Sequence, residues 1–536
     1  MRPSRGITAR FTAGLIGVGL ATAVAAQPPA VALPAAVPAA AEPPPNTILQ
    51  PGENPIDLGS ALKLAGVENP ELLRARARVS EMVALRQLAV AQLLPNLNLG
   101  TNYDLHRGVL QQSNGNILSV NRDATYFGLG ANATAAGTVN IPGLTYNLNV
   151  GEAWFGALVA RQRGRVAAAE ADAVRNDVLL RVCLGYLDLL RGDGRRAIAG
   201  RVRVDAAELA RLTAVYAEKG QGRKADADRA AVELRKRDAE VAQAEADTLV
   251  ATARLAQLLN LDPSTRLKPV DGWVVPAPLV PEPIPLPELL AVALMQRPEL
   301  AARRAEVRAS LYELSSAKLL PFSPNVITGF SAGGFGGGSN LVSSPPGFVN
   351  GSGVLTTGPR FGNVETRSDI DVVVYWTFRN MGVGNLALVR AADSRVRQMR
   401  FREVEVLNLV RAEVAESKAR ADARLLQIDA AEKAVRSSRA AYTEDLTRIK
   451  GGEGLPLEVV DSLRLSARSQ YEYLDAILDY NRAQFQLWVA LGRPPADSLA
   501  RAIPADLVPP PAYQVPVGPR VLTMPRTLPP LPVPAR

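Results

Sequence analysis

The sequence predicts a mainly α-helical protein with a membrane β part, built from two tandem repeats that each contain long coiled-coil helices and two β-strands. Three observations lead to this fold class: a set of short phrases that occurs twice in the same order, helical stretches far longer than those of a globular domain, and segments in which polar and apolar residues alternate. The order of these features makes each repeat run as helix, strands, long helix, tight turn and helix.

Composition excludes several classes of protein. The 536 residues contain one cysteine, Cys183, and one histidine, His106, which excludes a disulfide framework, a cysteine-based zinc site and the histidine clusters of most hydrolytic metal sites. The sequence Gly333-Gly334-Phe335-Gly336 lacks the strand-to-helix context of a nucleotide site. We therefore expect no enzyme, no cofactor and no metal site, with Cys183 packed in a helix and His106 in a solvated loop.

The net charge of +9 does not indicate a nucleic-acid partner. Much of the positive excess lies at the two ends, where Arg2, Arg5 and Arg10 begin the chain and the segment after residue 500 holds four arginines and one aspartate. The rest of the chain is close to neutral, so no nucleic-acid partner is expected.

The two ends have the composition of processing and linker segments. The first three arginines precede an apolar run from Phe11 to Ala26 that closes with an A-x-A-type site, as in a secretory signal peptide. This run is shorter than the roughly 20 apolar residues that span a bilayer. The sequence divides into residues 1–26 as signal peptide, 27–56 as Pro/Ala-rich linker, 57–270 as first helix-strand-strand-helix repeat, 271–287 as Pro-rich connector, 288–500 as second repeat and 501–536 as Pro-rich C-terminal tail.

The internal repeat rests on four pairs of phrases that occur in the same order in both halves. The pairs are Asn69–Leu72 with Arg297–Leu300, Leu93–Pro95 with Leu319–Pro321, Lys219–Gly222 with Lys450–Gly454, and Leu259-Asn260 with Leu491-Gly492. Each half therefore contains the same elements at the same offsets.

The helices are expected to be very unequal in length. The predicted ranges are 59–94, 153–218, 223–260, 288–320, 384–449 and 457–491. At 1.5 Å per residue the middle helix of each repeat is about 100 Å long, and the two shorter helices together reach roughly the same length. This equality indicates a long hairpin whose return limb is split. Coiled-coil packing is expected because apolar or small residues recur every seven positions, at Leu407, Val414, Ala421, Ile428, Val435, Tyr442 and Ile449.

The strand segments alternate between one apolar and one polar face. After Pro95, Leu97, Leu99, Tyr103 and Leu105 are separated by polar or small residues, which is typical of a wall between lipid and water. In the first repeat, residues 125–134 and 143–150 are alternatives for the second strand; in the second repeat, the candidates are 325–330 and 369–377. Of the 27 aromatic residues, 14 lie in residues 96–155 and 321–378, as in the aromatic girdles of a membrane protein.

Four strands cannot close a barrel by themselves. Outer-membrane barrels have at least about eight strands, and an eight-stranded interior is filled by side chains, so an open channel requires more than two copies of this chain. Three copies would supply twelve strands. Residues 106–122, 333–338 and 345–353 are expected to be loops at the outer face.

The repeated phrases together resemble the TolC-like outer-membrane efflux proteins, over about residues 57–495. The matching features are the repeated (Asn/Arg)-Pro-Glu-Leu, the repeated Leu-Leu-Pro before the first strand, the Gly-containing turns and the terminal Ala490-Leu491-Gly492. The resemblance implies a homotrimer in which a 12-stranded β-barrel in the outer membrane continues into a 12-helix α-barrel across the periplasm. A periplasmic adaptor protein and an inner-membrane transporter would be the other partners, besides outer-membrane lipid.

The same resemblance suggests site residues at the two tight turns. Glu458 and Asp461 fall where the family places the acidic pair at the closed periplasmic mouth, and Asp226 matches a position that ties neighbouring helices there. Acidic residues in the first turn of any helix also complement its dipole, so this role remains an alternative for Glu458 and Asp461. The turn glycines are expected to dock the adaptor; they are Gly220, Gly222, Gly451, Gly452 and Gly454.

Two functions are compatible with these features. The first is a passive outer-membrane channel, the exit duct through which an efflux pump or a type I secretion system moves small molecules or metal ions out of the periplasm. The alternative is a periplasmic coiled-coil scaffold without a pore, which accounts for the helices and leaves the alternating strands unexplained.

Overall fold

The computed structural model describes residues 53–111, 115–133, 138–271, 274–281, 283–339, 341–342, 354–355 and 364–495. These residues all belong to one compact unit, Pro51–Arg536, which is described here by itself. The predicted signal peptide, nearly all of the predicted linker, the predicted loop at 345–353 and the C-terminal tail lie outside the described residues.

Two long helices dominate the described chain. They are α3 (Val150–Glu218) and α7 (Val383–Lys450), with 69 and 68 residues, and each is followed by a helix of 35 residues, α4 (Lys224–Leu258) or α8 (Pro456–Ala490). At 1.5 Å per residue each long helix extends about 100 Å. The predicted long helices are therefore confirmed to within a few residues. Within the part of the chain described, no helix is both long and apolar enough to cross a membrane.

Four shorter helices complete the two repeats. They are α1 (Leu58–Glu68), α2 (Pro70–Ala91), α5 (Leu286–Gln296) and α6 (Pro298–Leu319). The sequence predicted one helix at 59–94 and one at 288–320, and both predictions are wrong because each range contains a break. Asn69 and Arg297 precede prolines and adopt extended backbone, with ψ of 124° and 119°, because the proline ring disfavours helical geometry in the residue before it.

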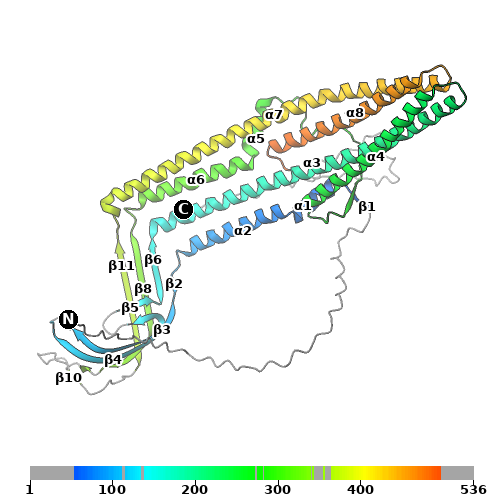
Figure 1. Ribbon diagram of the computed structural model, residues 1–536. Helices are drawn as coiled ribbons and strands as arrows, with labels where there is room; N and C mark the ends of the chain where they lie inside the picture. Colours follow the sequence, from blue (N-terminus) through cyan, green and yellow to red (C-terminus); the bar gives the residue numbers. More distant parts are fainter. Residues whose placement is uncertain are drawn as a thin grey trace, which may run out of the picture. The chain divides into compact units, whose positions relative to one another are not determined.

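Each long helix packs against the shorter helices of its own half of the chain (Figure 1). Helix α3 contacts α2 and α4, and α7 contacts α6 and α8, which is the arrangement expected of a hairpin whose return limb is split. Helix α3 also contacts α6 and α8, so the two repeats pack side by side. Along α7 the predicted heptad positions face this packing: Val414, Ala421, Ile428, Tyr442 and Ile449 are buried, and the other two are half-buried.

Two stretches of the chain, one between α2 and α3 and the other between α6 and α7, supply the strands of one antiparallel sheet. Its members are β2 (Asn96–Leu97), β3 (Leu99–Gln111), β4 (Ile117–Ala133), β5 (Val139–Pro142), β6 (Leu144–Asn149), β8 (Asn325–Ser339) and β11 (Glu365–Tyr375). Two-residue strands β9 (Leu341–Val342) and β10 (Val354–Leu355) pair with each other.

The sheet is four strands wide although it contains more than four segments. Strands β2 and β3 follow each other at one edge, and β6 and β4 occupy the next position, since β6 pairs with β2 and β4 pairs with β3. Both then pair with β8, which pairs with β11 at the other edge. Within the described residues, β3 and β11 pair on one side only, so both edges of the sheet are open.

Several strand predictions are corrected by this topology. The first repeat has more than two strand segments, and the alternatives 125–134 and 143–150 are both strands that share one position in the sheet. The predicted loop at 106–122 lies largely in β3 and β4, so His106 is a strand residue opposite Arg122. The predicted loop at 333–338 lies within β8, because its glycines allow close strand contact: a Cβ on Gly337 would lie 2.2 Å from the carbonyl oxygen of Asp123.

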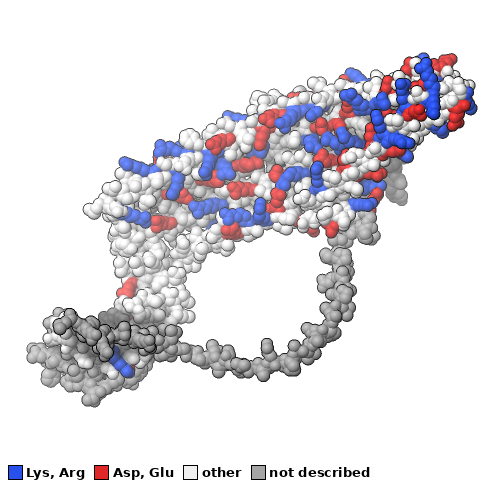
Figure 2. All heavy atoms as spheres, viewed as in Figure 1, with Lys and Arg blue, Asp and Glu red and all other residues white. Residues whose placement is uncertain are grey.

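The two faces of the sheet differ in polarity, as the alternation predicts. One face carries exposed apolar side chains such as Leu99, at 73% exposure, and Ile370, at 75%. The other face carries polar side chains, including an Asn102–Asp104 hydrogen bond of 2.8 Å. Figure 2 shows acidic and basic side chains of both signs over the helical part of the face in view and few over the described sheet.

A small parallel pair joins the start of the described chain to the end of the first repeat. Strand β1 (Glu53–Ile56) pairs with β7 (Arg266–Pro269), and Ile56 is buried in the core that α3, α4 and α8 also supply. Residues 53–56 were predicted to belong to a linker. They form a strand because Asn54 and Ile56 alternate with exposed neighbours and bury one side.

Candidate functional site

The candidate site lies where each long helix turns back on itself. Gly220 follows α3 with φ of 73°, and Gly452 follows α7 with φ of 82°. This left-handed geometry is readily adopted by glycine and costs other residues about 1 kcal/mol or more. In the first turn the N–H of Gly222 donates to the carbonyl oxygen of Tyr216 at 3.0 Å, which closes the helix end.

The turn glycines differ in the space around them. A Cβ on Gly220 or Gly452 would meet nothing within 4 Å, so both positions face open space. A Cβ on Gly454 would lie 2.8 Å from the backbone nitrogen of Ile449, and one on Gly222 would lie 3.2 Å from Tyr216 Cβ. Gly451 has φ of −78°, which any residue adopts. Gly220 and Gly452 therefore lie at the open surface of the turns. Gly222 and Gly454 allow the chain to pass close to the helix end.

The two turns are held together at the same end of the helical part (Figure 1). The Tyr216 hydroxyl, in the first repeat, donates to the carbonyl oxygen of Ile449 in the second repeat at 3.0 Å. Beneath them, a buried apolar cluster draws on all four helices of the two hairpins; it includes Val202, Leu209, Ala230, Tyr442, Ile449, Val459 and Leu463. The turns are therefore one structural region and not two separate tips.

The three predicted acidic residues lie close to these turns in sequence but have different surroundings. Glu458 is exposed in the first turn of α8 and forms no ion pair with a described residue. Asp461, one turn later, pairs with Arg464 at 3.4 Å and has a side chain 64% exposed. Asp226, in the first turn of α4, pairs with Arg229 of its own helix at 3.1 Å. The structure therefore links none of the three directly to another within one chain.

A buried carboxylate that the sequence analysis missed lies behind Asp461. Glu233 of α4 has a side chain only 2% exposed, and both of its oxygens accept hydrogen bonds from arginines. Arg464 of α8 donates to one oxygen at 2.7 Å, and Arg237 donates to the other at 2.6 Å. Arg464 also pairs with Asp461, so a chain of charges runs from the exposed face of α8 to the interior between α8 and α4.

This charge network keeps Glu233 ionised although it is buried. Burial raises the pKa of the carboxyl, but hydrogen bonds from Arg464 and Arg237 outweigh it and lower the pKa below the ordinary value of 4.5. Part of this network can be recognised in the sequence. Glu233 lies four residues before Arg237 and Glu240 three residues after it, a spacing that favours ion pairs on one helix face. The partner on α8 depends on the packing of two distant helices, so no local signal identifies it.

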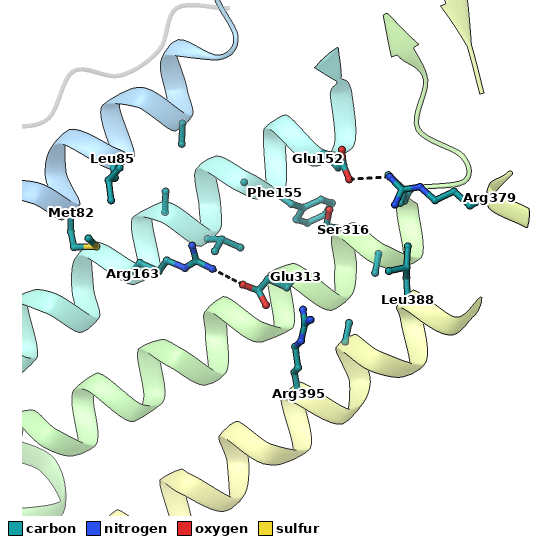
Figure 3. Close-up of a pocket in the computed structure, with 17 residues that line it drawn as sticks. Met82, Leu85, Glu152, Phe155, Arg163, Glu313, Ser316, Arg379, Leu388 and Arg395 are labelled. Carbon is teal, nitrogen blue, oxygen red and sulfur yellow. Dashed lines mark hydrogen bonds and ion pairs between the residues drawn. The ribbon is translucent and has the colours of Figure 1, made fainter. Parts of the chain in front are cut away.

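A hollow lies at the other end of the helices, next to the sheet (Figure 3). This cavity of about 540 Å³ is lined by residues of α2, α3, α6 and α7. Arg163 pairs with Glu313 across it at 3.0 Å, Arg379 lies 3.9 Å from Glu152, and Arg395 also reaches it. Since α2 and α7 are separated by α3 and α6, a hollow that touches all four runs across one side of the helix layer.

The single cysteine is not part of the candidate site. Cys183 is fully buried in α3, as expected, and burial raises the pKa of its thiol. Such a thiol remains protonated and unreactive at neutral pH.

Solved structures with a similar fold include outer-membrane channels. The outer-membrane channel OprN is 20% identical, with a TM-score of 0.63 over 81% of this chain and 89% of that chain. The Campylobacter jejuni CmeC channel is 14% identical, with a TM-score of 0.62 over 81% and 85%. The open state of the Neisseria gonorrhoeae MtrE channel is 20% identical, with a TM-score of 0.59 over 81% and 89%.

No protein-family model matches the sequence, and no curated protein matches it in sequence. The likeness to the solved channels therefore establishes the fold: a mainly helical chain with an antiparallel sheet, arranged as in those channels. The resemblance to TolC-like proteins that the repeated phrases suggest is confirmed at the level of the fold.

Proposed function

We propose that this chain forms a homotrimeric exit duct in the outer membrane that extends into the periplasm. The duct would let small molecules or metal ions leave the periplasm passively, as part of an efflux pump or a type I secretion system, and would catalyse no reaction. A periplasmic adaptor and an inner-membrane transporter would select the cargo and supply the energy.

One observation carries this proposal: a sheet four strands wide, with one apolar face, one polar face and two edges that no other described strand covers, continues directly into helices of about 100 Å. An open edge exposes unpaired N–H and C=O groups, which in lipid must be satisfied by another strand. Pairing β11 of one copy with β3 of the next, three times, would close a twelve-stranded barrel with its apolar face toward lipid.

The helices support the same arrangement. Their mixed-sign charged surface suits water, so the helical part would lie in the periplasm while the sheet lies in the membrane. The channels OprN, CmeC and MtrE, which share the fold, are described as outer-membrane channels. A coiled-coil scaffold without a pore would have no use for the exposed apolar face of the sheet.

The turn region would form the periplasmic mouth. In a trimer, Glu458 and Asp461 would supply two rings of three carboxylates, which would attract cations and disfavour anions. Asp226, tied to Arg229 on its own helix, would shape the first turn beside them. Gly220, Gly222, Gly451, Gly452 and Gly454 would present the turns to the adaptor.

Membrane fractionation separates the duct from the scaffold. Membranes of cells that express the chain are washed with high salt and then with carbonate, which removes peripheral proteins. A duct stays with the outer membrane through both washes, and the purified protein conducts ions in a planar bilayer. Release of the chain by either wash would support the scaffold and contradict the duct.

A further inference from the structure

The chain does not pass straight from β4 into β6 but first forms a short hairpin. The last residues of β4, Gly130–Ala133, pair in antiparallel register with β5, from Gly130 with Pro142 to Ala133 with Val139. Strand β5 also contacts β8 (Figure 1). We call these two paired arms the inner hairpin.

Backbone geometry directs the inner hairpin out of the sheet. Gly128, Gly130 and Asn132 all have positive φ, of 145°, 101° and 60°. Such values turn a strand sharply, and asparagine is the side chain that tolerates the left-handed region best after glycine. A Cβ on Gly130 would lie 2.6 Å from the carbonyl oxygen of Ile141, so the turn requires glycine.

The inner hairpin lies over the polar face of the sheet. Asn98 donates through Nδ2 to the carbonyl oxygen of Pro142 at 2.7 Å, and the N–H of Ala133 donates to Asn102 Oδ1 at 3.1 Å. Asn98 and Asn102 alternate along the strand with the exposed apolar Leu99, so they project from the opposite face.

Close packing holds the hairpin against this face. A Cβ on Gly100 would lie 2.7 Å from Ala131 Cβ, and a Cβ on Gly329 would lie 2.6 Å from Pro142 Cγ. Under the hairpin, a buried apolar cluster forms between the arms and the sheet; it comprises Tyr126, Ala133 and Val139, with Phe335 packed against them. The hairpin is therefore a fixed part of the wall and adds thickness to it.

We propose that the inner hairpin narrows the duct within the membrane and limits the size of what can leave. This inference rests on the proposed function, because the polar face lines a lumen only when three copies close a barrel. The side of the hairpin away from the wall carries Asn132 and Asn140, both exposed and uncharged. Three copies would therefore place a ring of neutral amides in the lumen, which selects by size and not by the sign of charge.

Two cysteine variants on the polar face test this constriction from outside intact cells. His106→Cys lies farther from the helices than the hairpin, and Asn147→Cys lies nearer to them, since Asn147 pairs with Ile327 close to the start of α3. Cells are treated with a small maleimide or with one that carries a long polyethylene glycol chain. The native Cys183 is buried and does not react, so wild-type cells are the control.

The constriction predicts a difference between the two sites. The small reagent should label both, whereas the long reagent should label His106→Cys and fail at Asn147→Cys. Equal labelling of both sites by the long reagent would overturn the proposed constriction and leave the duct intact. Exclusion of the long reagent from both sites would place the barrier outside the hairpin and would also overturn it. Failure of the small reagent at both sites would contradict the duct itself.

Two changes in the hairpin show whether it is the barrier. Ala131 and Ile141 form a pair, so replacing residues 132–140 with Asn-Gly closes the same pair with a two-residue turn. This shortened chain should admit the long reagent to Asn147→Cys, and continued exclusion would contradict the proposal. Asn140→Trp adds bulk at an exposed position. It should slow labelling of Asn147→Cys by reagents of intermediate size at least several-fold, with no change at His106→Cys; equal rates would also contradict the proposal.

Discussion

At the scale of single residues, Glu233 places a charged carboxylate in a buried position near the turns. It is held between Arg464 of α8 and Arg237 of its own helix, and each oxygen accepts from one of them. A buried charge is tolerated only when its partners are present, because removing one partner leaves the other desolvated and unpaired. The network therefore fixes how α4 and α8 meet near the turns.

Glu233→Gln tests this role through its pH dependence. At pH 7 we expect the variant to lose about 3 kcal/mol in free energy of unfolding, because it leaves two arginines without their shared carboxylate. The folded-state pKa lies below 4.5, so the carboxylate contributes its stability above the unfolded-state pKa and loses it as the pH falls through the folded-state pKa. The difference in Tm between wild type and variant should therefore shrink below about pH 4.

A matched control is Glu472→Gln on α8, the helix that carries Arg464. Glu472 pairs with Arg468 at 2.8 Å, but both side chains are exposed, and exposed pairs contribute at most about 1 kcal/mol. A loss for Glu233→Gln no larger than for this control would show that the buried network does not stabilise the turn region.

The predicted mouth residues are tested by neutralising both. Glu458→Gln with Asp461→Asn removes two carboxylates per chain from an exposed helix start, so the fold should remain intact. We expect lower cation preference and weaker block by divalent cations from the periplasmic side in planar-bilayer recordings. The control, Glu444→Gln with Glu453→Gln, removes two other exposed carboxylates of the same region.

The outcome separates the two interpretations of these residues. If these carboxylates only stabilise α8 through its dipole, the double variant would lose ~0.3–1 kcal/mol of helix stability per charge, and its ion selectivity would be unchanged. Selectivity and block equal to those of wild type would therefore remove Glu458 and Asp461 from the mouth.

At the scale of elements, the turns are built so that a side chain at Gly220 or Gly452 would point into open space. A bulky residue there would cost about 1 to 2 kcal/mol for the positive φ, and its Cβ would meet no atom within 4 Å. If the adaptor docks at the turns as proposed, Gly220→Phe or Gly452→Phe should leave trimer yield unchanged and reduce export strongly, because the changed turn would no longer fit it.

The matched control is Gly382→Phe at the start of α7. Gly382 also has positive φ, of 90°, and open space around its Cβ, but it lies at the opposite end of that helix from Gly452. Export measured with a fluorescent pump substrate should remain near wild type in this variant. Equal export in all three variants would argue against adaptor docking at the turns.

The helices could be predicted from sequence more accurately than the strands. Heptad positions such as Val414 and Ile428 are decided by the helix's own periodicity, and both are buried as expected. The breaks at Asn69 and Arg297 follow from the prolines after them, although the prediction overlooked them. The sheet was harder to predict from the sequence. Gly337, for example, is a residue type typical of loops, but here it allows β8 to pack closely against Asp123 of the neighbouring strand.

The site was predictable only in part for the same reason. The two turns could be predicted because glycine commonly ends a helix by adopting the left-handed conformation, which depends only on neighbouring residues. The partners of Glu233 and the inner hairpin depend on contacts between residues far apart in the sequence. Asn98 and Pro142, for example, are 44 residues apart, and nothing near either residue indicates that they meet.

At the scale of the whole molecule, the two repeats are joined by charges as well as by apolar packing. Arg191 and Arg195 of α3 pair with Asp475 of α8 at 3.2 Å and 2.6 Å, and Arg482 of α8 pairs with Asp188 of α3. This set of pairs fixes the helices of one repeat against those of the other. A chain whose helices are paired in this way, and whose described sheet has two open edges, is a suitable building block for a closed ring.

The number of chains per particle tests the central claim most directly. Light scattering of the detergent-solubilised protein, with the detergent contribution subtracted, gives this number independently of any partner or cargo. Since each chain supplies a sheet four strands wide, the proposed barrel predicts three chains per particle. A stable monomer or dimer that still conducts ions in a planar bilayer would contradict the trimeric duct.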